Sequence, residues 1–370
     1  MRPPRPGIRR GSKAWVVGLC VAALSSHWLL HEVTPAEAQT TNPAAPEEPT
    51  LEQRLQQLLA GGRYAEAEEL LRRLGDGGSV RALLALARLE AGRGRAEDAA
   101  GTLRKALDLA PNAEDVLSGF ARVHLGAGRP GPALQALEGL ARMHPEVAEH
   151  AYLLGVARLQ LGDLDGAAES LARTIELDPT EARHHLARGL ALNQLKRFAE
   201  AETSLRRALA LAPESTRALA ALAEAEEGLG RRDAAEQHAR SALAALAASR
   251  EASSTAPGDS ALSPSPAVTA ASAAATAHFV LGRLHMQAGE HAAARDAFLR
   301  ALATADDAAK VHYQLSLAYA RLGDHELSRL HRDDYTRLLR EADRRLAALQ
   351  SAPPLTARDS TAPHLEEGPE

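Results

Sequence analysis

Histidines are the residues of this chain best suited to binding a metal ion, but their spacing argues against it. His184 and His185 are adjacent, and neighbouring side chains on a helix point about 100° apart, so the two rings cannot share one ion. His278 and His285 lie on one helical face, but no nearby acid or third ligand completes a site around them. We therefore interpret the adjacent pair as packed side chains, and we expect neither a metal site nor a bound cofactor.

Motifs that activate a nucleophile or bind phosphate are absent from the sequence as well. The sequence contains no Gly-rich phosphate loop, no HExxH and no GxSxG motif. Cys20 is the only cysteine, which excludes an intrachain disulfide and a CxxC metal or redox site. Asp306 and Asp307 are interpreted as a turn rather than as an acid pair. We predict that the protein is not an enzyme, because helical repeats fill the folded length and leave no room for a separate catalytic domain.

The composition indicates a helical protein. Hydrophobic residues make up 45% of the chain but aromatic residues only 3%, so alanine and leucine, both good helix formers, carry most of the apolar character. Such a core suits closely packed helices better than a sheet rich in Val, Ile and Tyr. The formal net charge of -5 does not suggest a general nucleic-acid binder.

A repeat of 34 residues organises most of the chain. Prolines recur at this interval at Pro111, Pro145, Pro179 and Pro213, and alanines at Ala99, Ala133, Ala167, Ala201 and Ala235. Glycines recur at Gly94, Gly128, Gly162 and Gly230, with Lys196 at the remaining place. Five repeats, called the central repeats below, therefore begin at Val80, Glu114, Ala148, Ala182 and Thr216.

Each central repeat is expected to fold as a helical hairpin. In the third repeat, residues 151–161 form one amphipathic helix, and Gly162 ends it because glycine tolerates the left-handed conformation. A second helix follows over residues 164–177 and stops at Pro179, since proline cannot supply the helical N–H. Neither helix can bury its apolar stripe alone, so neighbouring hairpins must stack into one continuous core.

The pattern resembles the tetratricopeptide repeat (TPR) family, and the chain looks like an exported bacterial member of it, over roughly residues 48–335 apart from one gap at residues 251–275. The third repeat carries the family's motif residues at Leu154, Gly155, Gly162, Ala167, Leu171 and Pro179. A partial copy precedes the central repeats and two copies follow the gap, the first with Leu281, Gly282, Gly289, Ala294, Phe298 and Ala301. His124, Arg158 and Leu192 stand where the family has an aromatic residue. The resemblance implies an all-α fold, a right-handed α-solenoid of about eight helical hairpins.

The chain begins with the features of a secretory signal peptide. Residues 1–38 combine a basic start, an apolar run at 14–30 and the sequence Ala36-Glu37-Ala38, and we predict cleavage after Ala38. Alternatively, the apolar run stays in the inner membrane as an uncleaved anchor, because its length is at the short edge of what spans a bilayer. Residues 39–50 are predicted to form a flexible spacer, and residues 351–370 a disordered tail.

One gap interrupts the repeats. Residues 251–275 are a run of Ser, Ala, Thr and Pro, and we predict that they form a flexible linker. The linker would join a TPR block at 51–250, with a partial repeat and five full ones, to a second block at 276–350, with two repeats and a capping helix. A long loop inside one continuous superhelix is the alternative, and the sequence does not decide between the two.

The resemblance also implies a partner-binding surface. TPR superhelices bind peptides on the concave face, which positions 2, 5, 9 and 12 of each repeat line in the family. From these positions we take as candidate partner-binding residues Arg81, Arg88, Arg122, Tyr152, Val156, Arg183, Leu190 and Asn193. The apolar middle and the arginines toward the N-terminal end suit a partner segment with apolar anchors and acidic flanks. The same stripe could instead pack between adjacent helices, which is the more frequent role of such residues.

A signal peptide joined to an all-repeat body predicts a non-enzymatic scaffold or adaptor outside the cytoplasm of a bacterium, periplasmic or secreted. Its partners would be envelope or periplasmic proteins, and its task cell-envelope assembly or export. The alternative function is a regulatory or chaperone-like subunit of a periplasmic enzyme or cofactor-maturation complex. Neither function involves nucleic acid, and the membrane is contacted only through the signal segment if that segment stays uncleaved.

Overall fold

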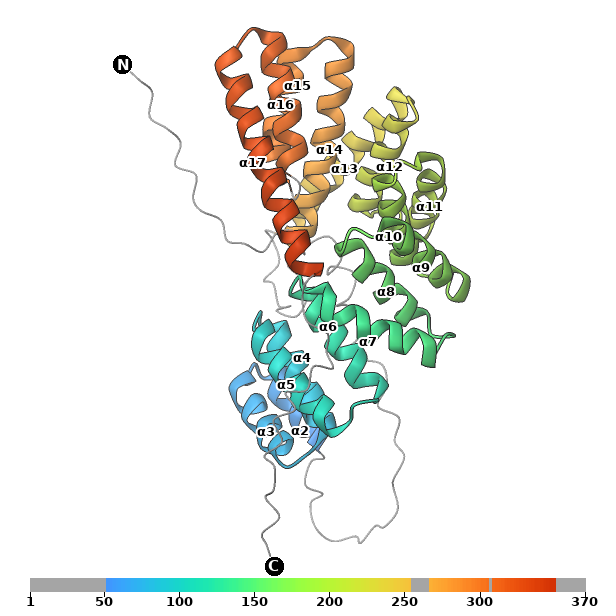
Figure 1. Ribbon diagram of the computed structural model, residues 1–370, viewed down its shortest axis with the longest axis vertical. Coiled ribbons are helices and arrows are strands. Elements are labelled where there is room, and N and C mark those ends of the chain that lie inside the picture. Colours follow the sequence, from blue (N-terminus) through green and yellow to red (C-terminus); the bar gives the residue numbers. More distant parts are fainter. Residues whose placement is uncertain (1–50, 254–265, 306–307, 351–370) are drawn as a thin grey trace, which may run out of the picture.

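The computed structural model describes residues 51–253, 266–305 and 308–350 of the chain. Over these residues the chain forms helices and no strand. In chain order the helices are α2 (Leu51–Ala60), α3 (Tyr64–Asp76), α4 (Val80–Gly92), α5 (Ala96–Leu109), α6 (Glu114–Gly126), α7 (Pro130–Met143), α8 (Ala148–Gln160), α9 (Leu164–Leu177), α10 (Ala182–Gln194), α11 (Phe198–Leu211), α12 (Thr216–Gly228), α13 (Arg232–Ser253), α14 (Pro266–Ala288), α15 (His291–Leu302), α16 (Ala308–Leu322) and α17 (His325–Gln350). They pair into eight successive hairpins, from α2 with α3 to α16 with α17, which confirms the predicted all-α solenoid (Figure 1).

The predicted starts of the five central repeats are confirmed. Helices α4, α6, α8, α10 and α12 begin at the residues that the 34-residue spacing selected. Local capping supports some of these starts. The Ser79 hydroxyl accepts a hydrogen bond from the Ala82 N–H at 3.3 Å, and Ser215 caps α12 in the same way through the Ala218 N–H. Side chains of this type satisfy N–H groups that have no partner inside the helix.

The turn inside each hairpin depends on one residue in the left-handed conformation. Glycine occupies this place in every described hairpin except the one formed by α10 and α11. There Lys196 has a φ of 59°, although it carries a side chain. A non-glycine residue in this conformation stores roughly 1–2 kcal/mol of strain, so this turn is less favourable than its neighbours.

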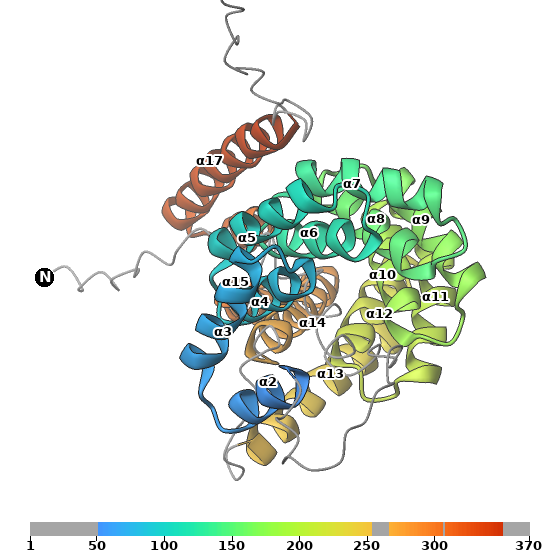
Figure 2. The ribbon, with the colours of Figure 1, turned by 90° about the horizontal axis from the view of Figure 1, so that it is seen from below.

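The helices form an inner and an outer layer. The first helices of consecutive hairpins contact one another along the whole series from α4 to α16. The second helices pack mainly against the helices that flank them in sequence, so they lie outside and spread apart. Figure 2 shows this arrangement, with α6, α8, α10 and α12 toward the axis and α7, α9 and α11 around them. The inner layer is therefore the concave face that the resemblance implied.

Small residues let the two helices of a hairpin approach closely. A Cβ added at Gly155 would lie 2.7 Å from the Cγ of Leu171, and one added at Gly189 would lie 2.5 Å from the Cγ of Leu205. Gly282 meets the ring of Phe298 in the same way after the gap. Such contacts leave no space for a larger side chain, since protein interiors are close-packed. The same packing rule thus holds on both sides of the gap.

The gap is shorter than the predicted linker, and the structure corrects the second block's start. Helix α13 continues to Ser253 and α14 begins at Pro266, so residues 266–275 are helical rather than linker. Helix α14 packs against both α12 and α13 through buried alanines, among them Ala220, Ala239 and Ala277. The stacking therefore runs through this point without a break, which agrees with the alternative of one continuous superhelix.

The end of the solenoid also differs from the prediction in one respect. The second helix of the last hairpin and the predicted cap are one uninterrupted helix, α17. Helix α17 contacts α7, so the superhelical winding brings the last hairpin back toward the third one (Figure 1). Among the described residues no helix is long and apolar enough to cross a membrane. The predicted signal peptide, spacer and C-terminal tail lie outside the described residues, as do residues 254–265 and the predicted turn at Asp306 and Asp307.

Candidate binding surface

Arginines line the inner layer toward its N-terminal end. Arg81 on α4 is exposed, whereas Arg88 on the same helix is partly buried. Burial lowers the pKa of Arg88, the charge of Asp115 on α6 raises it again, and the neighbouring charge of Arg122 lowers it. The charges on the consecutive first helices α4 and α6 are therefore close enough to influence one another.

Glu149 joins the inner layer of three hairpins. Its Oε1 lies 2.8 Å from Nη2 of Arg122 on α6, and its Oε2 lies 2.8 Å from Nη2 of Arg183 on α10. The Arg122 side chain is 12% exposed and that of Glu149 21%, so this bridge is much better shielded from water than a surface ion pair. Burial lowers the pKa of Arg122, and the charge of Glu149 opposes this shift. The bridge therefore fixes the spacing of three consecutive first helices.

Three of the candidate residues are not available to a partner, and here the structure corrects the prediction. Tyr152 and Val156 are each only 1% exposed and belong to the core that α8 shares with its neighbours. The buried Asn193 donates its Nδ2 hydrogen to the carbonyl of Ala221 at 2.8 Å. Consecutive first helices touch, so these stripe positions are covered by the next repeat. Of the apolar candidates, only Leu190 is partly exposed.

Tyr152 also supports the arginine above it. The guanidinium carbon of Arg183 lies 5.0 Å from the centre of the Tyr152 ring, a cation–π arrangement. The centre of the His184 ring lies 5.3 Å from the centre of the Tyr152 ring. The tyrosine is thus a structural support for the concave surface, and Arg81, Arg88, Arg122 and Arg183 are the candidates that can face a ligand.

The histidine predictions are confirmed for one pair and corrected for the other. His184 and His185 are buried, and their ring nitrogens lie 3.1 and 3.0 Å from the carbonyl oxygens of Asp178 and Pro179, as expected of packed side chains. An acid does stand next to His285, because its Nδ1 lies 2.6 Å from Oε2 of Glu290. The chain turns back at Gly289, and this turn brings the carboxylate to the histidine.

One cluster was not found from the sequence. His312 on α16 meets His331 and Asp334 on α17, so three donors of the kind that bind metals converge, contrary to our expectation. The two histidines are 19 residues apart and meet only because the last hairpin folds back. The available signal was the spacing of His331 and Asp334, since residues three apart share a helical face.

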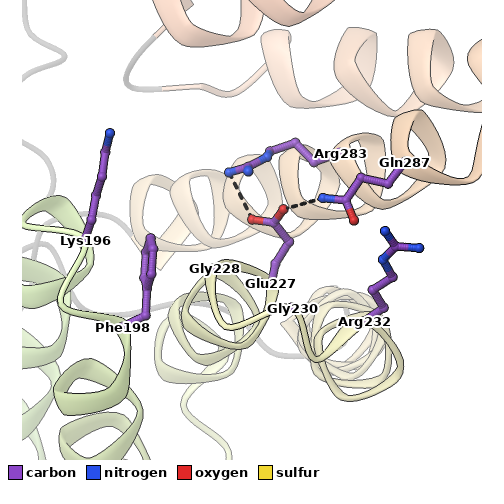
Figure 3. A pocket seen from close by; sticks show the side chains of 8 residues that line it. All are labelled: Lys196, Phe198, Glu227, Gly228, Gly230, Arg232, Arg283 and Gln287. Carbon is purple, nitrogen blue, oxygen red and sulfur yellow. Dashed lines mark hydrogen bonds and ion pairs between the residues drawn. The ribbon is translucent and has the colours of Figure 1, made fainter.

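An open pocket lies where α10 to α14 come together (Figure 3). Glu227 lines this pocket. Its carboxylate forms an ion pair with Arg283 at 2.9 Å and accepts a hydrogen bond from Gln287 at 2.8 Å. Burial raises the pKa of Glu227, and the charge of Arg283 opposes this. Lys196 and Arg232 line the sides of the pocket together with Phe198 (Figure 3). The lining therefore offers three cations and one carboxylate, a balance that suits an anionic group.

Comparisons with known proteins agree with the repeat pattern. A family model described as tetratricopeptide repeat matches residues 54–114, 119–182, 159–215, 186–251, 266–309 and 279–331. No curated protein matches the chain.

Three of the solved structures that are similar to parts of this chain are the following. A tetratricopeptide repeat protein from Parabacteroides merdae is similar at 16% identity with a TM-score of 0.50, over 72% of this chain and 97% of that one. TTC0263, a thermophilic TPR protein from Thermus thermophilus, is 29% identical with a TM-score of 0.39, over 45% of this chain and 90% of that one. MamA from Desulfovibrio magneticus is 23% identical with a TM-score of 0.41, over 44% of this chain and 92% of that one.

Proposed function

The chain belongs to the tetratricopeptide repeat family, whose members support protein–protein interaction, and on this basis we propose that it is a scaffold outside the cytoplasm that holds a partner protein by an acidic segment. Binding rather than catalysis is its task. The segment lies along the concave face, where the arginines of the first helices receive its carboxylates.

The charge balance of the inner layer is the observation that supports this proposal. In the first four central repeats, the second and ninth positions hold Arg81, Arg88, Arg122 and Arg183, against the two carboxylates of Asp115 and Glu149. Glu149 bridges two of these arginines, so a net positive charge remains. Arginine favours carboxylate ligands because its planar guanidinium can donate two parallel hydrogen bonds.

The apolar part of the predicted surface is smaller than expected, which changes the partner's description. Tyr152 and Val156 are buried, so the partner gains little from apolar anchors at the middle of the groove. Charge complementarity then carries more of the recognition, and such contacts act mainly on specificity and on the association rate. We infer a partner segment rich in Asp and Glu, with one apolar residue at most near Leu190.

Export is the second part of the proposal. It rests on the basic start, apolar run and Ala36-Glu37-Ala38 sequence of residues 1–38, which are typical of a secretory signal peptide. An exported scaffold finds its partners in the cell envelope, in assembly or export machinery. N-terminal sequencing of the protein from envelope fractions tests this: a chain beginning at Gln39 is expected, and full-length protein in the cytoplasm would contradict it.

The binding face is tested by crosslinking the tagged chain in cells, identifying the captured protein by mass spectrometry and measuring its affinity for purified variants. Arg81→Glu is the informative variant, because Arg81 is exposed on the inner helix α4 and its replacement leaves the core intact. Arg207→Glu is the matched control, since Arg207 is exposed on the outer helix α11. We expect Arg81→Glu to weaken binding about tenfold, most clearly at low salt. Equal affinity of both variants for the partner would refute the concave-face model.

A further inference from the structure

The last hairpin brings three metal-binding side chains together. His312 lies on α16, and His331 and Asp334 lie on α17, with one ligand atom from each within 4.8 Å of the others. The Nδ1 atoms of the two histidines are 2.9 Å apart, and Nδ1 of His312 is 3.8 Å from Oδ2 of Asp334. The His312 side chain is 13% exposed and that of Asp334 31%, so the cluster is largely shielded from water.

The geometry is close to what a tetrahedral ion needs. Zinc bonds of about 2.0–2.1 Å to nitrogen and oxygen place neighbouring ligand atoms about 3.3 Å apart in a tetrahedron. The two separations of 2.9 and 3.8 Å bracket this value, so small side-chain rotations would bring all three atoms onto one ion. Two facing imidazole nitrogens can share only one proton between them, whereas an ion accepts a lone pair from each.

Neighbouring side chains hold these donors in place. The Tyr319 ring stacks on His331 with an interplanar angle of 6° and a centroid distance of 5.4 Å. Nη2 of Arg337 lies 2.8 Å from Oδ1 of Asp334, which leaves Oδ2 as the oxygen directed toward His312. Contacts that neighbouring side chains make with metal ligands orient these ligands and tune the affinity of the site for the metal.

We propose that His312, His331 and Asp334 bind one divalent transition-metal ion of the zinc type. Two imidazole nitrogens and one carboxylate oxygen favour Zn²⁺, Cu²⁺ or Ni²⁺ over Mg²⁺ and Ca²⁺, which prefer oxygen ligands. The ion fastens α16 to α17 and therefore stabilises the hairpin that ends the solenoid. Three protein ligands leave a fourth position for water or for a side chain of a partner.

The site is tested by titrating the full chain with ZnCl₂ and with MgCl₂ in a calorimeter and by recording its thermal unfolding with each ion. We expect one Zn²⁺ per chain, a raised Tm with zinc only, and loss of both effects in EDTA. His331→Gln and Asp334→Asn are each expected to weaken Zn²⁺ binding by at least about tenfold. Absence of zinc binding by the wild-type chain would overturn the proposal.

The control separates this cluster from an ordinary histidine–carboxylate pair. His285 and Glu290 form such a pair at 2.6 Å, and the metal-donor groups found among the described residues do not include it. His285→Gln is therefore expected to bind Zn²⁺ like the wild type. If His285→Gln loses zinc as His331→Gln does, or if His331→Gln retains full affinity while its circular dichroism is native, the ion binds elsewhere and the proposal fails. Co²⁺ absorption gives an independent check, because its visible bands should change in Asp334→Asn.

Discussion

Two polar clusters of this solenoid differ in how their side chains pair with one another. In the central repeats, Glu149 meets Arg122 and Arg183, and each of its two carboxylate oxygens is paired with one guanidinium. In the last hairpin, His312 and His331 present the same ring nitrogen to each other, and one carboxylate stands beside them. The first cluster joins three consecutive first helices, and the second joins the two helices of the last hairpin. A tyrosine ring contacts each cluster.

The difference shows how to separate structural polar residues from those of a site. A cluster whose charges pair with one another holds helices together, and only its surplus charge, here that of two arginines against one glutamate, attracts a partner's carboxylate. A cluster in which several lone-pair donors converge can instead bind a cation, because a cation accepts an electron pair from each of them. Departure from the family's motif does not make this distinction, since Arg158 also departs from it and donates to Ser170 inside its own hairpin.

The largest change in the free energy of unfolding is expected from the tyrosines that contact the two clusters, Tyr152 and Tyr319. Tyr152 is 1% exposed, so Tyr152→Ala should lower the free energy of unfolding by about 3 kcal/mol through lost burial and a residual cavity. Tyr319 is only partly buried, and Tyr319→Ala should cost about 1 kcal/mol in the absence of metal. Urea denaturation of both variants in EDTA measures these losses. Equal losses would mean that the central cluster is no more essential to the fold than the terminal one.

His124 is a buried histidine whose ring nitrogens are unpaired, and it tests whether such a side chain by itself forms a binding site. It is buried on α6, neither ring nitrogen has a hydrogen-bond partner, and it belongs to no metal-donor group found among the described residues. Burial lowers its pKa from 6.5 to about 4, so the unfolded chain takes up a proton more readily than the folded one. Stability from the neutral ring is therefore complete above about pH 6.5 and is lost as the pH falls toward about 4, by at most about 3 kcal/mol.

His124→Phe should remove this pH dependence and raise the free energy of unfolding at neutral pH by about 1 kcal/mol, because a phenyl ring has no nitrogens to leave unsatisfied. His325→Phe, at an exposed position of α17, is the matched control and should leave the pH profile unchanged. Thermal unfolding between pH 4 and 7.5 measures both variants. A profile of His124→Phe that still falls in this range would show that other groups cause the acid sensitivity.

The sequence predicted the repeats far better than it predicted their surface. Helix starts followed from prolines and glycines at fixed spacing, since these residues end helices for local reasons. The burial of Tyr152 and Val156 depends on how closely the next first helix approaches, which no residue of their own repeat determines. The meeting of His312 and His331 likewise depends on the fold of the last hairpin, so a search for neighbours along the chain passed over it.

The helical part of the gap was missed for a related reason. Residues 266–275 are rich in alanine, serine and threonine and carry no strong apolar stripe. The helix that contains them is stabilised further along, where the buried Ala273 and Ala277 pack against α12 and α13. Tertiary packing thus outweighs the weak local preference of this segment.

The smallest effect is expected at the turn where the central repeats depart from their own pattern. Lys196 holds a φ of 59°, whereas the equivalent turns use glycine, so Lys196→Gly should raise the free energy of unfolding by about 1 kcal/mol. The reciprocal variant Gly162→Lys, at the same place in the preceding repeat, should lower it by a similar amount. Lys196 also lines the basic pocket, so its side chain offers a reason for tolerating the strain (Figure 3). If Lys196→Gly gains stability and weakens capture of the partner while Arg207→Glu does not, the pocket belongs to the binding surface. Gained stability with unchanged capture would restrict that surface to the arginines of the first helices.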